Sequence, residues 1–100
     1  MTDQQWDDLY SILKEKLGNW DLYSHVFDPT RDQEAIKGSL ADDIADIYRD
    51  LKKGLVCHHS DCKPPDDILC EWRLLFYSHW GDHATSALRT IHFLLEPTLS

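Results

Sequence analysis

The segment Ser39–Leu55 constrains the fold more than any other stretch of this chain. Its apolar residues recur at the spacing of an α-helix: Leu40, Ile44, Ile47, Leu51 and Leu55. Ser39 is a favourable N-cap residue with Asp42 at the capping-box position, and Gly54 follows two lysines, as is common at a helix end. A helix with one apolar stripe must bury that stripe against other elements, so the segment predicts a helical fold.

Two further stretches have helical periodicity. In the first, Thr2 and Gln5 form a capping-box pattern, Gly18 marks the end, and the apolar stripe is Trp6, Leu9, Tyr10, Leu13 and Leu17. In the second, Asp66 or Asp67 is a candidate N-cap after two prolines, and Pro97 is a candidate end. Its apolar stripe jumps in phase by about one residue near Gly81, which predicts one long helix that is kinked or broken there.

These stretches predict an all-α fold in a single helical domain, residues 1–100. We expect an up-and-down bundle of three main helices, roughly 3–18, 39–54 and 67–95. The connection 22–37 has no sustained period. We predict a turn after Asp28-Pro29, a short helical turn over 32–36, and apolar anchors at Tyr23, Val26 and Phe27.

The charge balance limits the class of partner. The chain has 18 acidic and 10 basic residues, a formal net charge of −8. Nucleic acids and anionic membranes bind basic surfaces, so neither is expected as a partner. The sequence also has no apolar run long enough to span a bilayer and no signal-peptide pattern, and we therefore predict a cytoplasmic protein.

The predicted central helix carries four carboxylates: Asp42, Asp43, Asp46 and Asp50. On a helical wheel Asp42 and Asp46 lie nearly opposite the apolar stripe, and Arg49 is placed to pair with Asp46. This pattern favours a solvated acidic face. The alternatives are a partner-binding face or a metal site that also takes residues from facing helices.

A second polar cluster is Cys57-His58-His59-Ser60-Asp61-Cys62, which contains every common type of zinc ligand. Structural zinc sites usually take their ligands from two separate short loops. A polar surface loop is therefore the first interpretation, with a zinc or other divalent-metal site at Cys57, His58, His59 and Cys62 as the alternative. Cys57 and Cys62 could pair if oxidised, although three cysteines, an odd number, fit a reducing compartment better than a disulfide framework.

A third cluster lies at the predicted kink, where His79 and His83 are four residues apart and Trp80 stands between them. His79 falls on the apolar face, so it needs a buried hydrogen-bond partner, and Asp43 or Asp50 is the expected one. One interpretation is an interhelical histidine with Trp80 packed beside it. The other is a ligand or metal pocket built on the two rings.

The chain resembles the uncharacterised bacterial domain-of-unknown-function family 5063. The residues that carry the resemblance are ADIYRDL at Ala45–Leu51, then Trp80-Gly81, then the pattern Ala87-Leu88-Arg89 with His92. It implies an all-α, cytoplasmic protein with no established activity, and it marks as positions of interest Asp46, Tyr48, Asp50, Trp80, Arg89 and His92. Family members are expected to carry additional helices before the region of Trp6, which would make this chain a short member or a C-terminal half.

Two functions of different classes follow. The first is a non-catalytic binding or protein-interaction module, which includes self-association, for which no catalytic residue and no cofactor is predicted. Its surface would draw on Asp46, Tyr48, Arg49, Asp50, His79, Trp80, His83, Arg89 and His92. The second is a metal-binding protein or metal-dependent enzyme with Asp and His ligands borne on helices. It requires a carboxylate of the central helix close to His79 or His83, with the ring nitrogens converging on one point.

Overall fold

The computed structural model describes the backbone of residues 1–99 and the side chains of residues 1–96. The elements are α1 (Asp3–Leu17), a 3-10 turn (Gly18–Trp20), β1 (Leu22–His25), β2 (Ile36–Ser39), α2 (Leu40–His59), α3 (Pro65–Leu75), a π-helical turn (Phe76–Trp80) and α4 (Gly81–Leu99). The fold is mostly helical, as predicted. No helix in the described part of the chain combines the length and the apolar character needed to cross a membrane.

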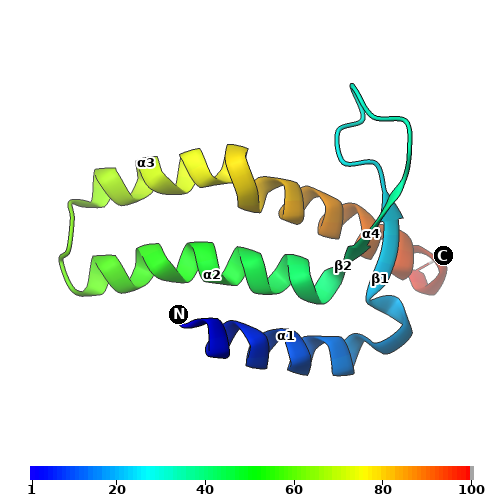
Figure 1. The fold of residues 1–100 in the computed structure, drawn as a ribbon, viewed down its shortest axis with the longest axis horizontal. Coiled ribbons are helices and arrows are strands. Elements are labelled where there is room, and N and C mark those ends of the chain that lie inside the picture. Colours follow the sequence, from blue (N-terminus) through cyan, green and yellow to red (C-terminus); the bar gives the residue numbers. More distant parts are fainter. Residues whose placement is uncertain (100) are drawn as a thin grey trace.

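The central helix of the structure is α2. Figure 1 shows α1 along one side of α2 and, along the other side, the long element formed by α3, the π-helical turn and α4, which we call the α3–α4 rod. The helix α2 contacts α1, α3 and α4. The buried hydrophobic residues are mostly small: Leu40, Ala41, Ala45, Cys57, Ile68 and Ala87. Because α2 has neighbours on two sides, its buried positions are not confined to the predicted stripe, and Leu55 at the end of that stripe stays exposed.

The predicted helix starts are confirmed at α1 and α2. The Thr2 hydroxyl accepts a hydrogen bond from the Gln5 N–H at 3.1 Å, and the Gln5 side chain accepts one from the Thr2 N–H at 2.8 Å. Gly18 ends α1 with φ 54°, a conformation that favours glycine. Ser39 caps α2 by accepting from the Asp42 N–H at 3.2 Å.

The connection between α1 and α2 contains a two-stranded antiparallel sheet that the sequence analysis did not predict. Tyr23 of β1 pairs with Gly38 of β2, and the Tyr23 ring lies so close to Gly38 that a side chain there would collide with it. The predicted helical turn over 32–36 is wrong, because Ile36 already belongs to β2. Strands of four residues are too short to show a period of two, and pairing between them depends on residues distant in the sequence.

The boundaries of the later helices differ from the prediction. Gly54 does not end α2, which continues to His59; instead Gly54 is buried beneath the Trp72 ring, whose Cε2 would lie 2.7 Å from an added Cβ. The helix α3 starts at Pro65, where the missing N–H costs nothing, and not near residue 67. The helix α4 continues to Leu99 and so passes Pro97, which was the candidate end, rather than ending near residue 95.

The predicted phase change near Gly81 is confirmed as a π-helical turn. The Gly81 N–H donates to the Phe76 carbonyl oxygen, five residues earlier, so one extra residue is inserted into the helix. The Phe76 ring packs over Gly81, where an added Cβ would lie 2.8 Å from Cδ2 of that ring. A glycine is therefore required by close packing at this point.

A buried carboxylate anchors the start of α2 to the end of α1. Asp21, with 1% of its surface exposed, accepts a hydrogen bond from the Ala41 N–H at 2.7 Å and from the Ser39 hydroxyl at 2.9 Å. Its backbone oxygen accepts from the Leu40 N–H at 2.8 Å. A carboxylate at a helix N-terminus is favourable because unpaired N–H groups and the helix dipole point towards it.

We expect Asp21→Ala to lower the free energy of unfolding by about 2–3 kcal/mol, because the Ala41 N–H loses its buried acceptor. Urea denaturation followed by circular dichroism measures this loss. Glu34→Gln, a change of one charge at an exposed position, is the control and is expected to unfold like the wild type. Equal midpoints for Asp21→Ala and the wild type would refute the anchoring role.

Candidate metal centre

Two histidines from the α3–α4 rod face the carboxylates of α2. His79 belongs to the π-helical turn and His83 to the first turn of α4. Their ring centroids lie 4.9 Å apart, with one ring edge towards the face of the other. The rod is thus held so that both imidazoles point at the same part of α2.

Each histidine is fixed through Nδ1 by a carboxylate. Nδ1 of His79 lies 2.6 Å from Asp50 Oδ2, and Nδ1 of His83 lies 2.6 Å from Asp43 Oδ1. An ionised carboxylate only accepts hydrogen bonds, so each Nδ1 carries the proton and donates. The expected pairing of His79 with Asp50 is confirmed. Both rings consequently present Nε2 on their opposite side.

The two Nε2 atoms converge on Asp46. Its Oδ2 lies 3.5 Å from Nε2 of His79 and 3.1 Å from Nε2 of His83. Its other oxygen, Oδ1, accepts from Nε1 of Trp6 at 2.9 Å and from Nη2 of Arg49 at 3.0 Å. These two donors orient the carboxylate and leave Oδ2 turned towards the histidines.

The spacing of these atoms matches that of ligands around a metal ion. His79, His83 and Asp46 each offer one atom, and the three atoms lie within 4.8 Å of one another. With bonds of about 2.0–2.2 Å, tetrahedral ligands are about 3.3–3.6 Å apart and neighbouring octahedral ligands about 2.8–3.1 Å. A second group with the same property, Asp42, Asp43 and His83, shares one ring with the first. The geometric requirement of the metal hypothesis is therefore met.

The burial of the acidic residues corrects the sequence analysis. Asp43 and Asp46 are 5% and 7% exposed, so the prediction that Asp46 belongs to a solvated face is wrong. The reason is that α1 covers that side of α2 and supplies the Trp6 N–H. The predicted pair of Asp46 with Arg49 is present, but it is part of a partly buried network.

The close carboxylates change the protonation of their neighbours. The hydrogen bond to Asp43 raises the pKa of His83 above its ordinary value of 6.5, burial opposes this, and the charges of Asp43, Asp46 and Asp42 add to it. Burial, with the charge of Asp46, raises the pKa of Asp42. Tyr23, which donates to Asp43 Oδ2, has a raised pKa because of burial and that hydrogen bond.

Other residues singled out in the sequence lie away from this centre. Nε1 of Trp80 donates to the Trp72 carbonyl at 3.1 Å, and its ring packs on Phe76, which is a structural role. Tyr48 is exposed on α2, and His92 contacts Phe93 on α4. Arg89 lines a separate cleft. The residues that sequence reasoning missed are Trp6 and Tyr23, whose only signal was an aromatic ring with a polar atom.

The cysteine cluster takes a different form. Cys57 and Cys62 are joined as a disulfide across the end of α2, which confirms that these two can pair. Bonded sulfurs are not thiolates, so they cannot bind zinc in this form. His58 and His59 lie on the last turn of α2, with ring centroids 6.0 Å apart, and Cys70 is free and exposed.

The histidine–carboxylate centre is open on one side. A hollow of about 560 Å³ reaches His79, His83, Asp42 and Asp43, and its far walls come from α1 and the two strands. Both histidines line this hollow, whereas Asp46, which their Nε2 atoms face, does not. The centre is therefore accessible to ions and small ligands, although the carboxylates behind it are buried.

The comparison with protein families shows to which family the chain belongs. The model of the family described as "Domain of unknown function (DUF5063)" matches residues 1–96. The chain belongs to this family. Searches of curated proteins and of solved structures found no match for it. The resemblance carried by Ala45–Leu51 is thus confirmed. Because the family is described by no function, a function for this chain has to be inferred from the site itself.

In metal-free protein we expect His83 to stabilise the fold in a pH-dependent way. Because its folded-state pKa is raised, its contribution is full below about pH 6.5, the ordinary value, and is lost as the pH rises through the folded-state pKa. The difference in melting temperature between the wild type and His83→Gln, measured with chelator from pH 6 to 9, should therefore shrink with rising pH. A difference that does not change with pH would contradict a charged His83.

Proposed function

We propose that this DUF5063 domain binds a divalent transition-metal ion through Nε2 of His79, Nε2 of His83 and Oδ2 of Asp46. The observation that supports this most is the convergence of these three atoms, with distances of 3.1 and 3.5 Å from Asp46 to the rings. Both rings are already turned by carboxylates on Nδ1. An ion would enter a site whose ligands need little reorganisation.

The surroundings of the three ligands support the same proposal. Metal-binding histidines usually donate their other ring N–H to a carboxylate or carbonyl, which fixes the tautomer and increases the basicity of the ligand atom. Here Asp50 and Asp43 are the carboxylates that accept from Nδ1 of His79 and His83. Trp6 and Arg49 likewise orient Asp46 by donating to its Oδ1. An interhelical histidine needs only one hydrogen-bond partner, whereas here both rings and the carboxylate that they face are each held by partners of their own.

Charge also favours a cation here. Four carboxylates surround the two imidazoles, and Arg49 is the basic side chain paired with them. Without metal, the raised pKa of His83 favours its protonated form, which would donate to Asp43 and face Asp46. A metal ion replaces the proton on Nε2, so binding should weaken in acid.

The ligand set selects among metals. Two imidazoles and a carboxylate suit zinc, iron, cobalt or nickel better than calcium or magnesium, and we take zinc as the first candidate. Three protein ligands leave at least one coordination position for water or substrate. Two of the three, His79 and His83, line the open hollow. This arrangement is typical of metal sites that bind or activate a small molecule. The sequence analysis favoured a protein without catalytic activity.

We expect metal-stripped protein to bind one zinc ion per chain in calorimetric titration, and cobalt to give the visible absorption of a bound ion. His79→Gln and Asp46→Asn should each remove most of the binding, since each deletes a ligand atom. Asp50→Asn should weaken binding about 10- to 100-fold, because it only orients His79. A chelator should lower the melting temperature of the loaded wild type.

The matched control is His58→Gln/His59→Gln, which removes two histidines at the end of α2 and should leave the affinity unchanged. If this variant abolished binding while His79→Gln retained it, the proposed centre would be wrong. Two ions per chain would instead favour use of the second group, Asp42, Asp43 and His83.

A second candidate function is self-association through α4. The apolar residues that recur at helical spacing along this helix are buried only at Ala87. The exposed ones are Leu88, Ile91, Leu94 and Leu95, of which Leu94 also lines the cleft between β1 and α4. Leu88 is 71% exposed. Exposed apolar surface of this kind marks interaction sites, and we take a second copy of the chain as the partner that would cover it.

For this candidate we expect light scattering after size exclusion to give the mass of a dimer. The variant Leu88→Glu/Leu95→Glu should shift the wild type towards the monomer, because it places charges in an apolar contact. Leu69→Glu, an exposed leucine on α3, is the control. A wild type that remains monomeric at high concentration would exclude the dimer.

A further inference from the structure

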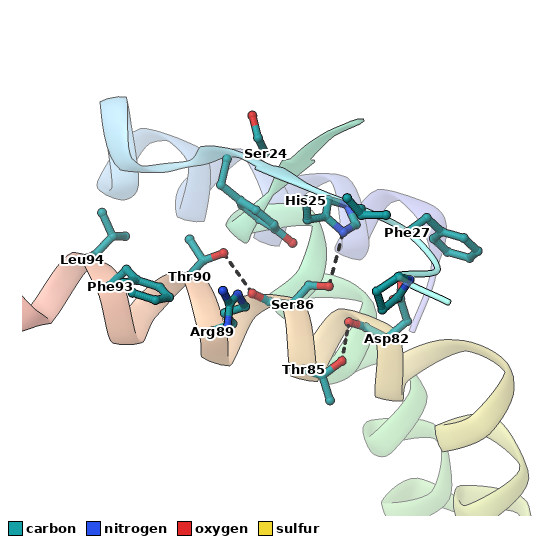
Figure 2. Close-up of a pocket in the computed structure, with 13 residues that line it drawn as sticks. Ser24, His25, Phe27, Asp82, Thr85, Ser86, Arg89, Thr90, Phe93 and Leu94 are labelled. Carbon is teal, nitrogen blue, oxygen red and sulfur yellow. Dashed lines mark hydrogen bonds between the residues drawn. The ribbon is translucent and has the colours of Figure 1, made fainter. Parts of the chain in front are cut away.

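A larger cleft lies beside the metal centre, between β1 with its following loop and the face of α4. Its volume is about 900 Å³, which is in the range of small-molecule sites. Figure 2 shows the β1 segment above α4, with Phe27 and Phe93 at opposite ends of the cleft and Arg89 between them. The cleft has apolar ends and a polar middle.

The face that α4 turns to this cleft is polar where a packed helix would be apolar. Its residues follow helical spacing: Asp82, Thr85, Ser86, Arg89, Thr90 and Phe93. The hydroxyls of Thr85 and Thr90 donate to carbonyls of their own helix, at 3.0 and 2.9 Å, so they bring no free proton to a ligand. Ser86 and His25, 3.5 Å apart, form a hydrogen bond with each other, and Arg89 is the basic side chain among the lining residues.

Arg89 is held over a ring. Its guanidinium carbon lies 5.1 Å from the centre of the Phe93 ring, which keeps the planar group in place at the wall of the cleft. Among the described side chains no carboxylate forms an ion pair with it. A guanidinium in this position offers parallel N–H donors that match a carboxylate or phosphate.

We propose that this cleft binds a small organic anion with an aromatic body, whose carboxylate or phosphate group is bound by Arg89. The aromatic body would lie against Phe93, Phe27 or Tyr23, which also line the cleft. The shared chemistry of the two head groups is a compact anion with several acceptor oxygens.

Asp82 limits where the anionic group can lie. It lines both this cleft and the hollow beside His79 and His83, and so do His25 and Phe27, so the two spaces are neighbours that share these residues as a wall. Its negative charge repels an anion from the end nearest His83, so the head group belongs at the Arg89 end. The inference thereby names a ligand class for the space beside the proposed metal centre, but its test does not require a metal.

The test uses phenyl phosphate and benzoate as probes, titrated into metal-free, full-length protein and followed by calorimetry and by backbone amide NMR. At least one probe should bind and shift the amides of residues 23–27 and 85–90. Arg89→Gln should weaken that binding at least tenfold, because a charge-assisted pair of hydrogen bonds is lost. Asp82→Asn should tighten it, since a like charge is removed.

Arg73→Gln is the matched control, because it removes one exposed arginine from α3 and leaves the cleft intact. Inorganic phosphate and phenol, the two parts of one probe, should each bind more weakly than phenyl phosphate. Equal affinity of Arg89→Gln and wild type, equal losses for Arg89→Gln and Arg73→Gln, or no binding of either probe would overturn the proposal. If zinc fails to bind but binding that depends on Arg89 persists, only the metal centre is wrong.

Discussion

The structure depends on two buried carboxylates near the N-terminal end of α2, Asp43 and Asp46. A buried, ionised carboxylate is costly unless its oxygens are hydrogen-bonded or paired. Asp43 receives the Tyr23 hydroxyl and the His83 ring, and Asp46 receives Trp6, Arg49 and the two facing imidazoles. Apart from Arg49 of α2 itself, these partners come from α1, β1, the π-helical turn and α4, so satisfying two side chains holds separate segments in place.

The π-helical turn completes this arrangement from the other side. The apolar face of α3 packs on α2 through Ile68 and Trp72, and a regular helix would carry that same phase into α4. The extra residue in Phe76–Trp80 resets the phase, and the rod presents its two histidines to α2 and its polar stripe to β1. Such turns recur at functional sites, because they place side chains where a regular helix cannot.

Local signals predicted the helices, and long-range contacts decided what they missed. Thr2, Ser39 and Gly18 were recognisable because capping depends on a few neighbouring residues. The burial of Asp46 was not recognisable from the sequence. An apolar stripe shows which face of a helix packs against one neighbour, but it does not show whether a second neighbour covers the opposite face. A carboxylate partner for His79 could be predicted, because a polar ring on an apolar face needs a hydrogen-bond partner and Asp43 and Asp50 were the two candidates. The structure pairs His79 with Asp50.

The same network explains why the two proposed sites belong together. In metal-free protein the carboxylates of α2 and Asp82 make the hollow negative, which disfavours an anion in the adjoining cleft. A divalent ion at His79, His83 and Asp46 removes part of that repulsion and should strengthen anion binding at Arg89. By thermodynamic reciprocity the anion must then strengthen metal binding by the same factor. His79, His83 and Arg89 follow one another along the joined helices α3 and α4, so the groups that would bind the metal and the anion are carried by one continuous helical element.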